Sequence, residues 1–488
     1  MYISKERSLA VKLSDSLSQY FTPTIGLRQG DVISPTLFNF FIHDLMEQFD
    51  ISCEPPKLGN ITVQNLLNAD DLILMSKTEQ GLQNCLNKLH TFCNMWDLEV
   101  NTEKTKVVVF NKKSELLNPT IKYKCQKIES VLTYKYLGLN FHVNGNLSTP
   151  KKDLVNRGLK AMFKLMSCFK SSHPSFNTSI HLFDHVVKPV LLYASEIWGS
   201  DHITMKSSLH NFMLKDTLEK CHLKFLRYIL GVNKKAPNLA IYGDSGRYPL
   251  VLYSVIQQIK YLQRLIRITE KENTLLYNAL AENHLLRSTK SWLRKINTLL
   301  SKLNLTLNDI SNNNIITLTN KIKACFHSAF IEYWQTEMSS DQRKGEQGNK
   351  LRTHRKFKTT FTKEPYLTDC QNSAHRKSFA KLRLSAHKLQ IETGRYSKER
   401  LPPDKRLCTI CNNNECEDEF HFVMCCAKYS NLRQNLFQTV EKLYPHFKML
   451  NNDSRFIWLM ANADSKIINL IAKFIHECFQ VRYKHNNS

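Results

Sequence analysis

Two adjacent aspartates, Asp70 and Asp71, interrupt an apolar run that extends from residue 66 to residue 75. Short apolar arms on either side of two acids predict a β-hairpin with the acids at its turn. An ionised carboxylate in apolar surroundings is costly unless a partner compensates its charge. A divalent cation is one such partner, because Mg²⁺ prefers oxygen ligands from carboxylates and phosphates. The alternative is an ordinary acidic turn, and the two residues alone do not decide between these interpretations.

The composition of the whole chain is that of a globular protein with more than one domain. A chain of 488 residues predicts two to four domains of about 100–200 residues each, and 42% hydrophobic residues suffice for packed cores. The apolar stretches are too short to span a membrane, and the first residues lack a signal-peptide pattern. These features predict an intracellular protein of the cytoplasm or nucleus, without a membrane partner, whose 14 cysteines are reduced.

Positive charge is the strongest compositional signal. The chain has 68 Lys and Arg against 43 Asp and Glu, a net charge of +25, which favours polyanionic partners such as nucleic acids. Residues 343–406 alone contain 18 basic and 6 acidic residues. Five aromatic residues lie among these charges and are predicted to stack on bases: Phe357, Phe361, Tyr366, Phe379 and Tyr396. The alternative is a solvated basic face or linker.

The pattern of apolar residues changes along the chain. The first part predicts a helix that begins at Ser34-Pro35, an amphipathic helix over 82–96 and a buried strand over 107–110. Such a mixture predicts an α+β domain with helices packed on one face of a sheet. After residue 150 the periodicity is helical, and it is clearest over 154–169, 209–230, 251–268, 292–303, 456–470 and 471–483. The polar residues 339–352 predict a linker.

Four short motifs follow one another within the first 140 residues. They are Gly26-Leu27-Arg28-Gln29-Gly30-Asp31 with Ser34-Pro35, then Asn68-Ala69-Asp70-Asp71, Asn101-x-x-Lys104-Thr105-Lys106, and Tyr134-Lys135-Tyr136-Leu137-Gly138. In this order and spacing they resemble the reverse transcriptase (ORF2-type polyprotein) of non-LTR, LINE-type retrotransposons. Two later segments, 188–199 and 381–396, are similar to sequences that such elements carry downstream of the palm.

The resemblance implies an α+β fold. It consists of a partial right-hand polymerase palm of helices and antiparallel sheet, followed by a mostly α-helical thumb and a C-terminal region with a small Cys/His zinc-type module. The implied divisions are 1–145, a partial palm without fingers and first catalytic strand; 146–235, a thumb-like helical domain; 236–340, a helical connector; 341–406, a basic nucleic-acid-binding stretch; and 407–488, the Cys/His module and C-terminal helices.

The resemblance also implies a chemistry, RNA-directed DNA synthesis by two-metal nucleotidyl transfer, with an RNA template, a DNA target or primer and deoxynucleoside triphosphates. It assigns Mg²⁺ or Mn²⁺ binding to Asp70 and Asp71. Lys104 is a candidate donor to the leaving pyrophosphate, or else a surface lysine on a turn. The implied nucleotide and template contacts are Arg28, Gln29 and Gly30, and the implied primer grip is Tyr136, Leu137 and Gly138.

Two departures from the family pattern bear on activity. The family has a further catalytic aspartate upstream of the Gly26 segment, where only Asp15 occurs here, in a polar context unlike a palm strand. Asn68 stands where the family usually has an aromatic residue that packs under the primer. We therefore expect a 5'-truncated chain that does not polymerise unaided. The alternative is a non-catalytic RNA- or DNA-binding remnant that acts through its basic stretch and zinc module.

A cysteine cluster near the C-terminus predicts a second metal. Cys408-x₂-Cys411 and His421-x₃-Cys425 supply four ligands for tetrahedral Zn²⁺, and the spacing of His421 and Cys425 places both on one side of a helix. Its expected task is to grip template RNA or target DNA. The alternative is a cluster of reduced thiols in a core.

Further residues of the cluster have weaker assignments. Cys416 and Cys426 are spare thiols that could replace a ligand, and three neighbouring acids are expected to order the ligands: Glu417, Asp418 and Glu419.

Overall fold

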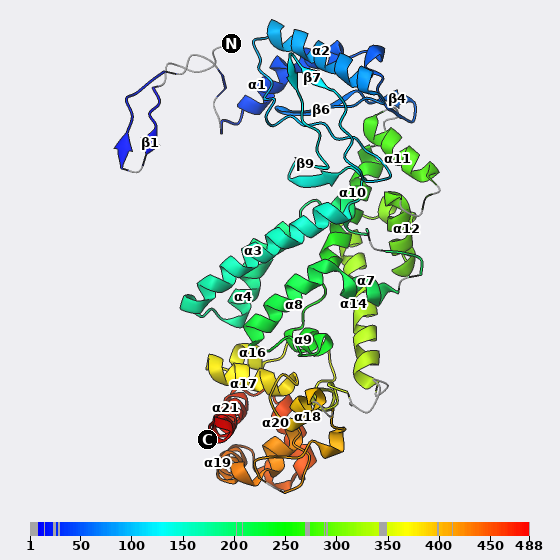
Figure 1. The fold of residues 1–488 in the computed structure, drawn as a ribbon. Helices are drawn as coiled ribbons and strands as arrows, with labels where there is room; N and C mark the ends of the chain where they lie inside the picture. The colour runs from blue at the N-terminus through cyan, green and yellow to red at the C-terminus, as the bar shows by residue number, and fades with distance from the viewer. Residues whose placement is uncertain are drawn as a thin grey trace. The chain divides into compact units, whose positions relative to one another are not determined.

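The computed structural model describes residues 8–13, 15–22, 26–27, 30–201, 203–206, 208–268, 274–286, 288, 291–340, 349–397, 400–411 and 413–487. The chain forms two compact units (Figure 1). The first consists of Met1–Asn146 and Lys271–Glu282, and the second of Leu147–Glu270 and Asn283–Ser488.

The acid pair lies on a β-hairpin, as predicted. Strands β5 (Asn65–Asn68) and β6 (Asp71–Leu74) are antiparallel, and Asn68 pairs with Asp71. The two-residue turn is therefore Ala69-Asp70. Ala69 has a φ of 54°, in the left-handed region that a residue with a Cβ enters only at some cost in energy.

The core of the first unit is built around one helix. Helix α2 (Glu79–Met95) confirms the predicted amphipathic helix, and Thr78 caps it by accepting a hydrogen bond from the Gly81 amide. Its buried face packs with Phe49 of the preceding segment and Ile121 of the following one. Helix α1 (Ser34–Phe41) begins at the predicted position, with its proline in the first turn, and none of its residues is buried.

The strands of the first unit form separate pairs rather than one sheet. The described pairs besides the β5–β6 hairpin are β1 (Lys12–Leu13) with β2 (Ser16–Leu17), β3 (Lys57–Leu58) with β4 (Ile61–Thr62), β7 (Lys122–Tyr123) with β8 (Gln126–Lys127), and β9 (Thr133–Tyr136) with β10 (Leu139–His142).

The predicted strand over 107–110 is wrong. Only Val107 forms a bridge, in parallel orientation with Ser130, whereas the Asn111 amide donates to Val143. Because the backbone of this segment bonds to different parts of the chain, no regular ladder forms.

The second unit is helical. Its first half contains α3 (Ser148–Ser172), α4 (Phe176–Leu182), a π-helical segment (Phe183–Val187), α5 (Lys188–Leu191), α6 (Ser195–Trp198), α7 (Leu209–Lys215), α8 (Thr217–Leu230), α9 (Asn238–Ser245), α10 (Val251–Ile268), α12 (Trp292–Lys302), α13 (Leu307–Asn312) and α14 (Ile315–Ser339). Helix α11 (Leu275–Leu285) spans residues of both units. The helices predicted over 154–169, 251–268 and 292–303 are confirmed.

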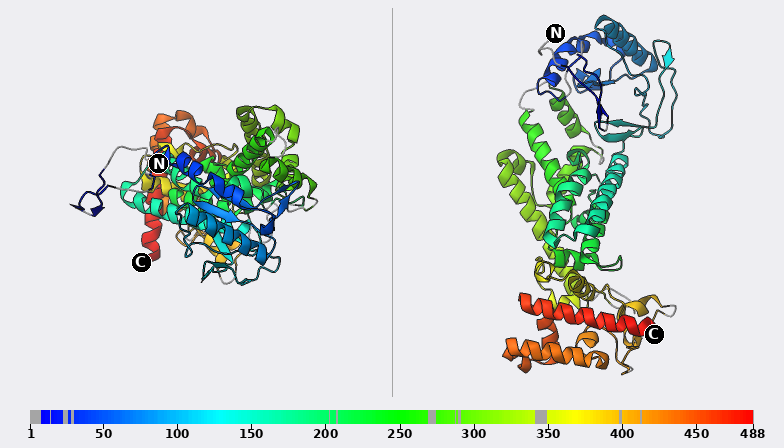
Figure 2. Two further views of the ribbon diagram at one scale, coloured as in Figure 1. Left: turned by 90° about the horizontal axis from the view of Figure 1, so that it is seen from above. Right: turned by 90° about the vertical axis from the view of Figure 1, so that its left-hand side faces the viewer.

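Two predicted helices are interrupted. The helix over 209–230 divides at Asp216, whose side chain caps α8 by accepting from the Leu218 amide. The C-terminal helices divide at residues 462–464 rather than at 470, which gives α20 (Asn452–Ala461) and α21 (Ser465–Asn487). Helix α21 packs against α17 (Ser373–Arg383) and α19 (Ser430–Leu443) (Figure 2). None of the described helices is long and apolar enough to cross a membrane.

The segment with the excess of basic residues is folded into the second unit. Phe357, Tyr366 and Phe379 are at most 7% exposed, and their ring centroids lie 4.6, 5.1 and 5.6 Å from the Arg383 guanidinium carbon. The prediction that these three rings stack on bases is wrong, because they line the pocket of a buried arginine. Of the five aromatic residues named in this segment, only Tyr396 is exposed.

Buried acids outside this segment neutralise part of its charge. Arg383 pairs with Asp244 at 3.0 Å, and His354 Nε2 lies 2.9 Å from the same carboxylate. Arg352 pairs with Glu419 at 2.8 Å. The basic segment is therefore held by ion pairs to α9 and to the Cys/His region, and only part of its charge faces solvent.

Candidate polymerase hairpin and metal centre

The β5–β6 hairpin carries its acids into solvent. Asn68, Asp70 and Asp71 are all exposed, whereas Leu72 and Leu74 pack against the core around α2. The expectation that the aspartates lie in apolar surroundings is therefore wrong, because the turn projects them beyond the apolar arms. Two exposed carboxylates at one tip can offer hard oxygen ligands to a divalent cation.

A second hairpin lies near the first. The turn between β9 and β10 is Leu137-Gly138, and both residues have positive φ, at 43° and 81°. A two-residue hairpin turn with two positive φ angles favours glycine at the second position, as found here. Burial raises the pKa of Tyr136, and the charge of Asp71 raises this pKa further. The structure therefore brings Tyr136, a predicted primer-grip residue, near a predicted metal ligand.

The other predicted palm residues are not assembled in this way. Lys104 is exposed in a turn where its backbone N–H donates to Asn101 Oδ1 at 3.0 Å, and its ammonium makes no ion pair with a described carboxylate. Gly30 has a φ of 88° and no neighbour within 4 Å of an added Cβ. Arg28 and Gln29 lie outside the described residues.

The acid pair has no third ligand within the described part of the chain. No third His, Cys, Asp or Glu among those residues joins Asp70 and Asp71 in a group that could hold a metal. Asp15 is exposed in the turn of the β1–β2 hairpin. The described residues thus fit a site with two carboxylate ligands.

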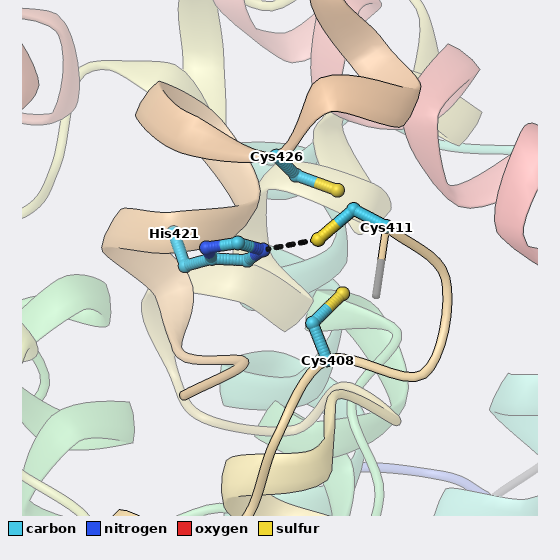
Figure 3. A group of neighbouring side chains, drawn as sticks. All are labelled: Cys408, Cys411, His421 and Cys426. Carbon is cyan, nitrogen blue, oxygen red and sulfur yellow. Dashed lines mark hydrogen bonds between the residues drawn. The ribbon is translucent and has the colours of Figure 1, made fainter. Parts of the chain in front are cut away.

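Four side chains near the C-terminus do form a group with the geometry of a metal site (Figure 3). The ligand atoms of Cys408, Cys411, His421 and Cys426 all lie within 4.8 Å of one another, and Cys411 Sγ lies 3.4 Å from His421 Nε2. A tetrahedral Zn²⁺ with bonds of about 2.0–2.3 Å holds its ligand atoms about 3.3–3.8 Å apart. A small contraction would bring the group to this spacing, so a Cys₃His set fits zinc.

The fourth member of the group is Cys426, not the predicted Cys425. The predicted ligand assumed an α-helix, in which residues four apart share a face. Residues His421–Cys425 instead form a π-helical turn, and the Cys426 amide donates to the His421 carbonyl at 2.8 Å. A π turn brings residues five apart to the same side. Cys416 also lies outside the group, where its thiol donates to the Pro403 carbonyl.

Acidic residues surround the Cys/His group. His421 Nδ1 lies 2.7 Å from Glu415 Oε2, and the His421 amide donates to Asp418 Oδ1 at 2.7 Å. The Cys408 thiol lies 3.6 Å from Glu417 Oε1. Asp418 and Glu417 therefore contact the group as predicted, whereas Glu419 pairs with Arg352 instead.

Glu415 is a partner of the group that the sequence alone does not predict. An acidic residue six positions before the histidine has no regular spacing that would mark it as a partner. Its position fixes the histidine proton on Nδ1 and leaves Nε2 directed at Cys411, which is the arrangement found at protein metal sites.

Burial raises the pKa values of thiols in the Cys/His group. Burial raises the pKa of Cys426 to about 12 and also raises the pKa of Cys408. These thiols are therefore neutral at neutral pH in the protein alone. A bound cation reverses this preference, because its charge deprotonates a coordinating thiol.

The family match with known proteins falls within the first unit of the structure. Residues 3–141 match the family described as reverse transcriptase (RNA-dependent DNA polymerase). The chain is 30% identical over 153 residues to the Retrovirus-related Pol polyprotein from type-2 retrotransposable element R2DM of Drosophila melanogaster. It is also similar to the probable RNA-directed DNA polymerase from transposon BS and to the RNA-directed DNA polymerase from mobile element jockey of the same fly, at 25% and 22% identity.

The first part of this chain is thus similar to the reverse transcriptases of LINE-type retrotransposons. The three matches cover 28%, 40% and 43% of the chain. They cover only 14%, 22% and 23% of those relatives, so the chain spans a minor part of their length.

Proposed function

We propose that the β5–β6 hairpin is the metal-binding part of an RNA-directed DNA polymerase. The observation that carries the proposal is the position of Asp70 and Asp71, exposed at one hairpin tip with Tyr136 of a second hairpin nearby. Its support from the comparisons is the family match over residues 3–141. In this proposal the substrates are an RNA template, a DNA primer or target and deoxynucleoside triphosphates.

Each palm residue has a proposed role. Asp70 and Asp71 would hold Mg²⁺ or Mn²⁺, and the bound cation would supply positive charge for the primer hydroxyl and the triphosphate. Tyr136 and the Leu137-Gly138 turn hold the primer end near these acids. Lys104 places its proton on the leaving pyrophosphate.

The nucleotide and template contacts are assigned to the segment before α1. Gly30, with Arg28 and Gln29, contacts the incoming nucleotide and the template, because a glycine lets its backbone approach a ligand closely.

We further propose that the chain does not polymerise unaided. Two-metal catalysis in this family uses a further palm aspartate, and no third ligand accompanies Asp70 and Asp71 among the described residues. Asp70 and Asp71 alone would offer too few carboxylate ligands to hold two divalent cations.

Primer extension tests both proposals. Purified chain is incubated with an RNA template, an annealed DNA primer, deoxynucleoside triphosphates and Mg²⁺ or Mn²⁺, beside a double variant, Asp70→Asn with Asp71→Asn. Equal, background-level incorporation supports the incomplete site. Incorporation above the double variant overturns the incomplete site and supports polymerase activity. Incorporation that is high and equal in both chains contradicts the assignment of the acids.

A second function, nucleic-acid binding through a zinc module, is favoured by the Cys₃His group and its Glu415 partner. In this proposal Zn²⁺ fixes the loop of Cys408 and Cys411 against the π turn of His421 and Cys426, and the rigid module grips template RNA or target DNA. The test is RNA and DNA binding by wild type and Cys408→Ser at matched concentration. Equal binding by a variant that has lost its zinc would contradict this role.

A further inference from the structure

A lysine-rich surface surrounds the exposed ring of Tyr396 in the second unit. Tyr396 ends a 3₁₀ turn (Gly394–Tyr396) and is 54% exposed. The Lys235 ammonium lies 3.4 Å from the centroid of its ring, and the Lys350 ammonium lies 5.6 Å from it. Lys350 also donates to the Lys235 carbonyl at 2.9 Å, so the three residues form one local arrangement.

The loop that carries Lys235 connects this ring to helix α17. Gly231, at the start of the loop, lies so close to Lys377 that an added Cβ would come within 2.6 Å of its side chain. Asn233 donates to the Ala386 carbonyl at 3.0 Å, in the turn after α17. These contacts hold residues 231–236 between α17 and Tyr396.

Exposed lysines extend along these segments. Lys234 and Lys235 lie on the loop, Lys377 and Lys381 lie one helical turn apart on α17, and Lys388 follows Ala386. Within the described residues none of these five ammonium groups has a carboxylate partner, whereas many basic side chains elsewhere in the unit are paired. Glu392, beneath the surface, already pairs with Lys350 and Arg352. The surface therefore keeps its positive charge.

An exposed ring beside unpaired lysines has the chemistry of a single-strand binding site. Stacking on an aromatic ring needs an unpaired base, because bases in a duplex are already stacked. Lysine ammonium groups contact the phosphates on either side of such a base. An acidic peptide would use the lysines without needing the ring, so the ring favours nucleic acid.

We propose that Tyr396 and the lysines of the 231–236 loop and α17 bind single-stranded nucleic acid, with a base on the tyrosine and phosphates on the lysines. This inference rests on the proposed function in taking nucleic acid as the ligand. It differs from the predicted basic stretch in two ways. Two of its five unpaired lysines come from a loop more than 140 residues before Lys377, and most aromatic rings of the stretch are excluded from it.

Binding of the full chain to a fluorescent 20-nucleotide single strand tests the proposal, by anisotropy and without nucleotides or added Mg²⁺. Tyr396→Ala is expected to weaken binding about 5- to 100-fold, and Tyr396→Phe, which retains the ring, is expected to bind like the wild type. Tyr483→Ala is the matched control, because this tyrosine is also exposed, at 68%. Equal effects of Tyr396→Ala and Tyr483→Ala would overturn the proposal.

The role of the lysines is tested by the salt dependence of the binding affinity. Lys234→Gln with Lys235→Gln is expected to reduce the slope of log affinity against log salt concentration by about 0.7 for each lost phosphate contact. Lys442→Gln with Lys448→Gln removes the same charge from exposed positions elsewhere and is expected to leave the slope unchanged. Equal slopes for the two double variants would overturn the role of the loop.

Two competitors separate the alternatives. Duplex DNA and polyglutamate are added as competitors of the single strand. If either displaces the single strand at equal concentration, and Tyr396→Ala has no effect on binding, the surface is a general anion-binding surface and the proposal of a single-strand site is overturned. A chain that fails in primer extension but binds through Tyr396 supports this inference while the polymerase proposal fails. A chain that extends primers but binds independently of Tyr396 overturns the inference alone.

Discussion

Glu415 Oε2 lies 2.7 Å from Nδ1 of His421, and this contact sets the direction of the histidine ring. With its Nδ1 proton held by the carboxylate, the ring directs Nε2 at the thiol of Cys411, 3.4 Å away. A surface carboxylate that orients a buried histidine towards cysteines makes sense if the histidine binds a metal, because such a contact holds the ring in the orientation that a metal ligand needs.

The identity of the fourth zinc ligand is the first prediction. Cys426→Ser is expected to lower the zinc content from about one per chain to well below it, because the π turn places this thiol beside the other ligands. Cys425→Ser is the matched control, since the neighbouring thiol lies outside the group. Metal content is measured on purified chains by mass spectrometry. Loss of zinc in Cys425→Ser and its retention in Cys426→Ser would show that the π turn misplaces the ligands.

The contact of Glu415 with His421 is the second prediction. Glu415→Gln retains an acceptor but removes the charge, and Glu415→Ala removes both. We expect zinc affinity to fall about 10- to 100-fold in Glu415→Ala and less in Glu415→Gln. Competition with a chromophoric chelator measures the affinity. An affinity unchanged in Glu415→Ala would mean that the carboxylate does not support the metal ligand.

Acid sensitivity of the second unit is the third prediction. Burial alone would raise the pKa of Asp244 and of Glu419. The charges and hydrogen bonds of Arg383 and His354 together outweigh burial at Asp244, and those of Arg352, His387 and Thr353 together do so at Glu419. Both pKa values therefore lie below the usual range. As the pH falls below about 5, these two carboxyl groups take up protons in the unfolded chain before they do so in the folded chain. The ion pairs therefore stabilise the fold above the unfolded pKa of about 4, and this stabilisation is lost as the pH falls below it.

This loss is measured by urea unfolding at a series of pH values. We expect the free energy of unfolding of the second unit to fall by several kcal/mol between about pH 5 and about pH 3. Asp244→Asn is expected to flatten part of this dependence, in a chain that is less stable at neutral pH. An unfolding midpoint that is the same at pH 5 and pH 3 would contradict the assignment of these buried ion pairs.

The buried arginine of α17 gives the fourth prediction. Arg383 is 1% exposed and bonds to Asp244, Glu364 and the Met460 carbonyl. Arg383→Met leaves Asp244 buried with less compensation, and we expect a loss of about 3–5 kcal/mol in the free energy of unfolding. Arg355→Met, at a basic residue that is not fully buried, is the comparison and is expected to cost much less. Equal losses in the two variants would contradict this account.

Local patterns in the sequence were sufficient where the structure depends on local geometry. The hairpin of Asp70 and Asp71 and helix α10 follow from apolar spacing within a few residues. The pattern failed at Cys426, because the choice between an α turn and a π turn at His421 depends on how the turn packs rather than on spacing. The prediction of base stacking failed at Phe357, whose ring is buried against Arg383.

The buried aromatic rings show the second limit of local patterns. The partner that draws Arg383 into the interior is Asp244, 139 residues away. Seen without this partner, a basic segment with interleaved aromatic rings has the composition of a nucleic-acid-binding surface. Only Tyr396 and the lysines around it, brought together by the 231–236 loop, retain that character in the folded protein.

Metal binding at the hairpin tip tests the central claim most directly. The free Mn²⁺ signal in electron paramagnetic resonance is followed as wild-type chain, with primer–template and a nucleotide it cannot incorporate, is titrated in. The same titration is made with Asp70→Asn and Asp71→Asn combined, after the Cys/His group is filled with zinc. The account predicts Mn²⁺ binding in the wild type that is lost in the double variant, whereas equal binding in both chains would contradict the assignment of Asp70 and Asp71 as metal ligands.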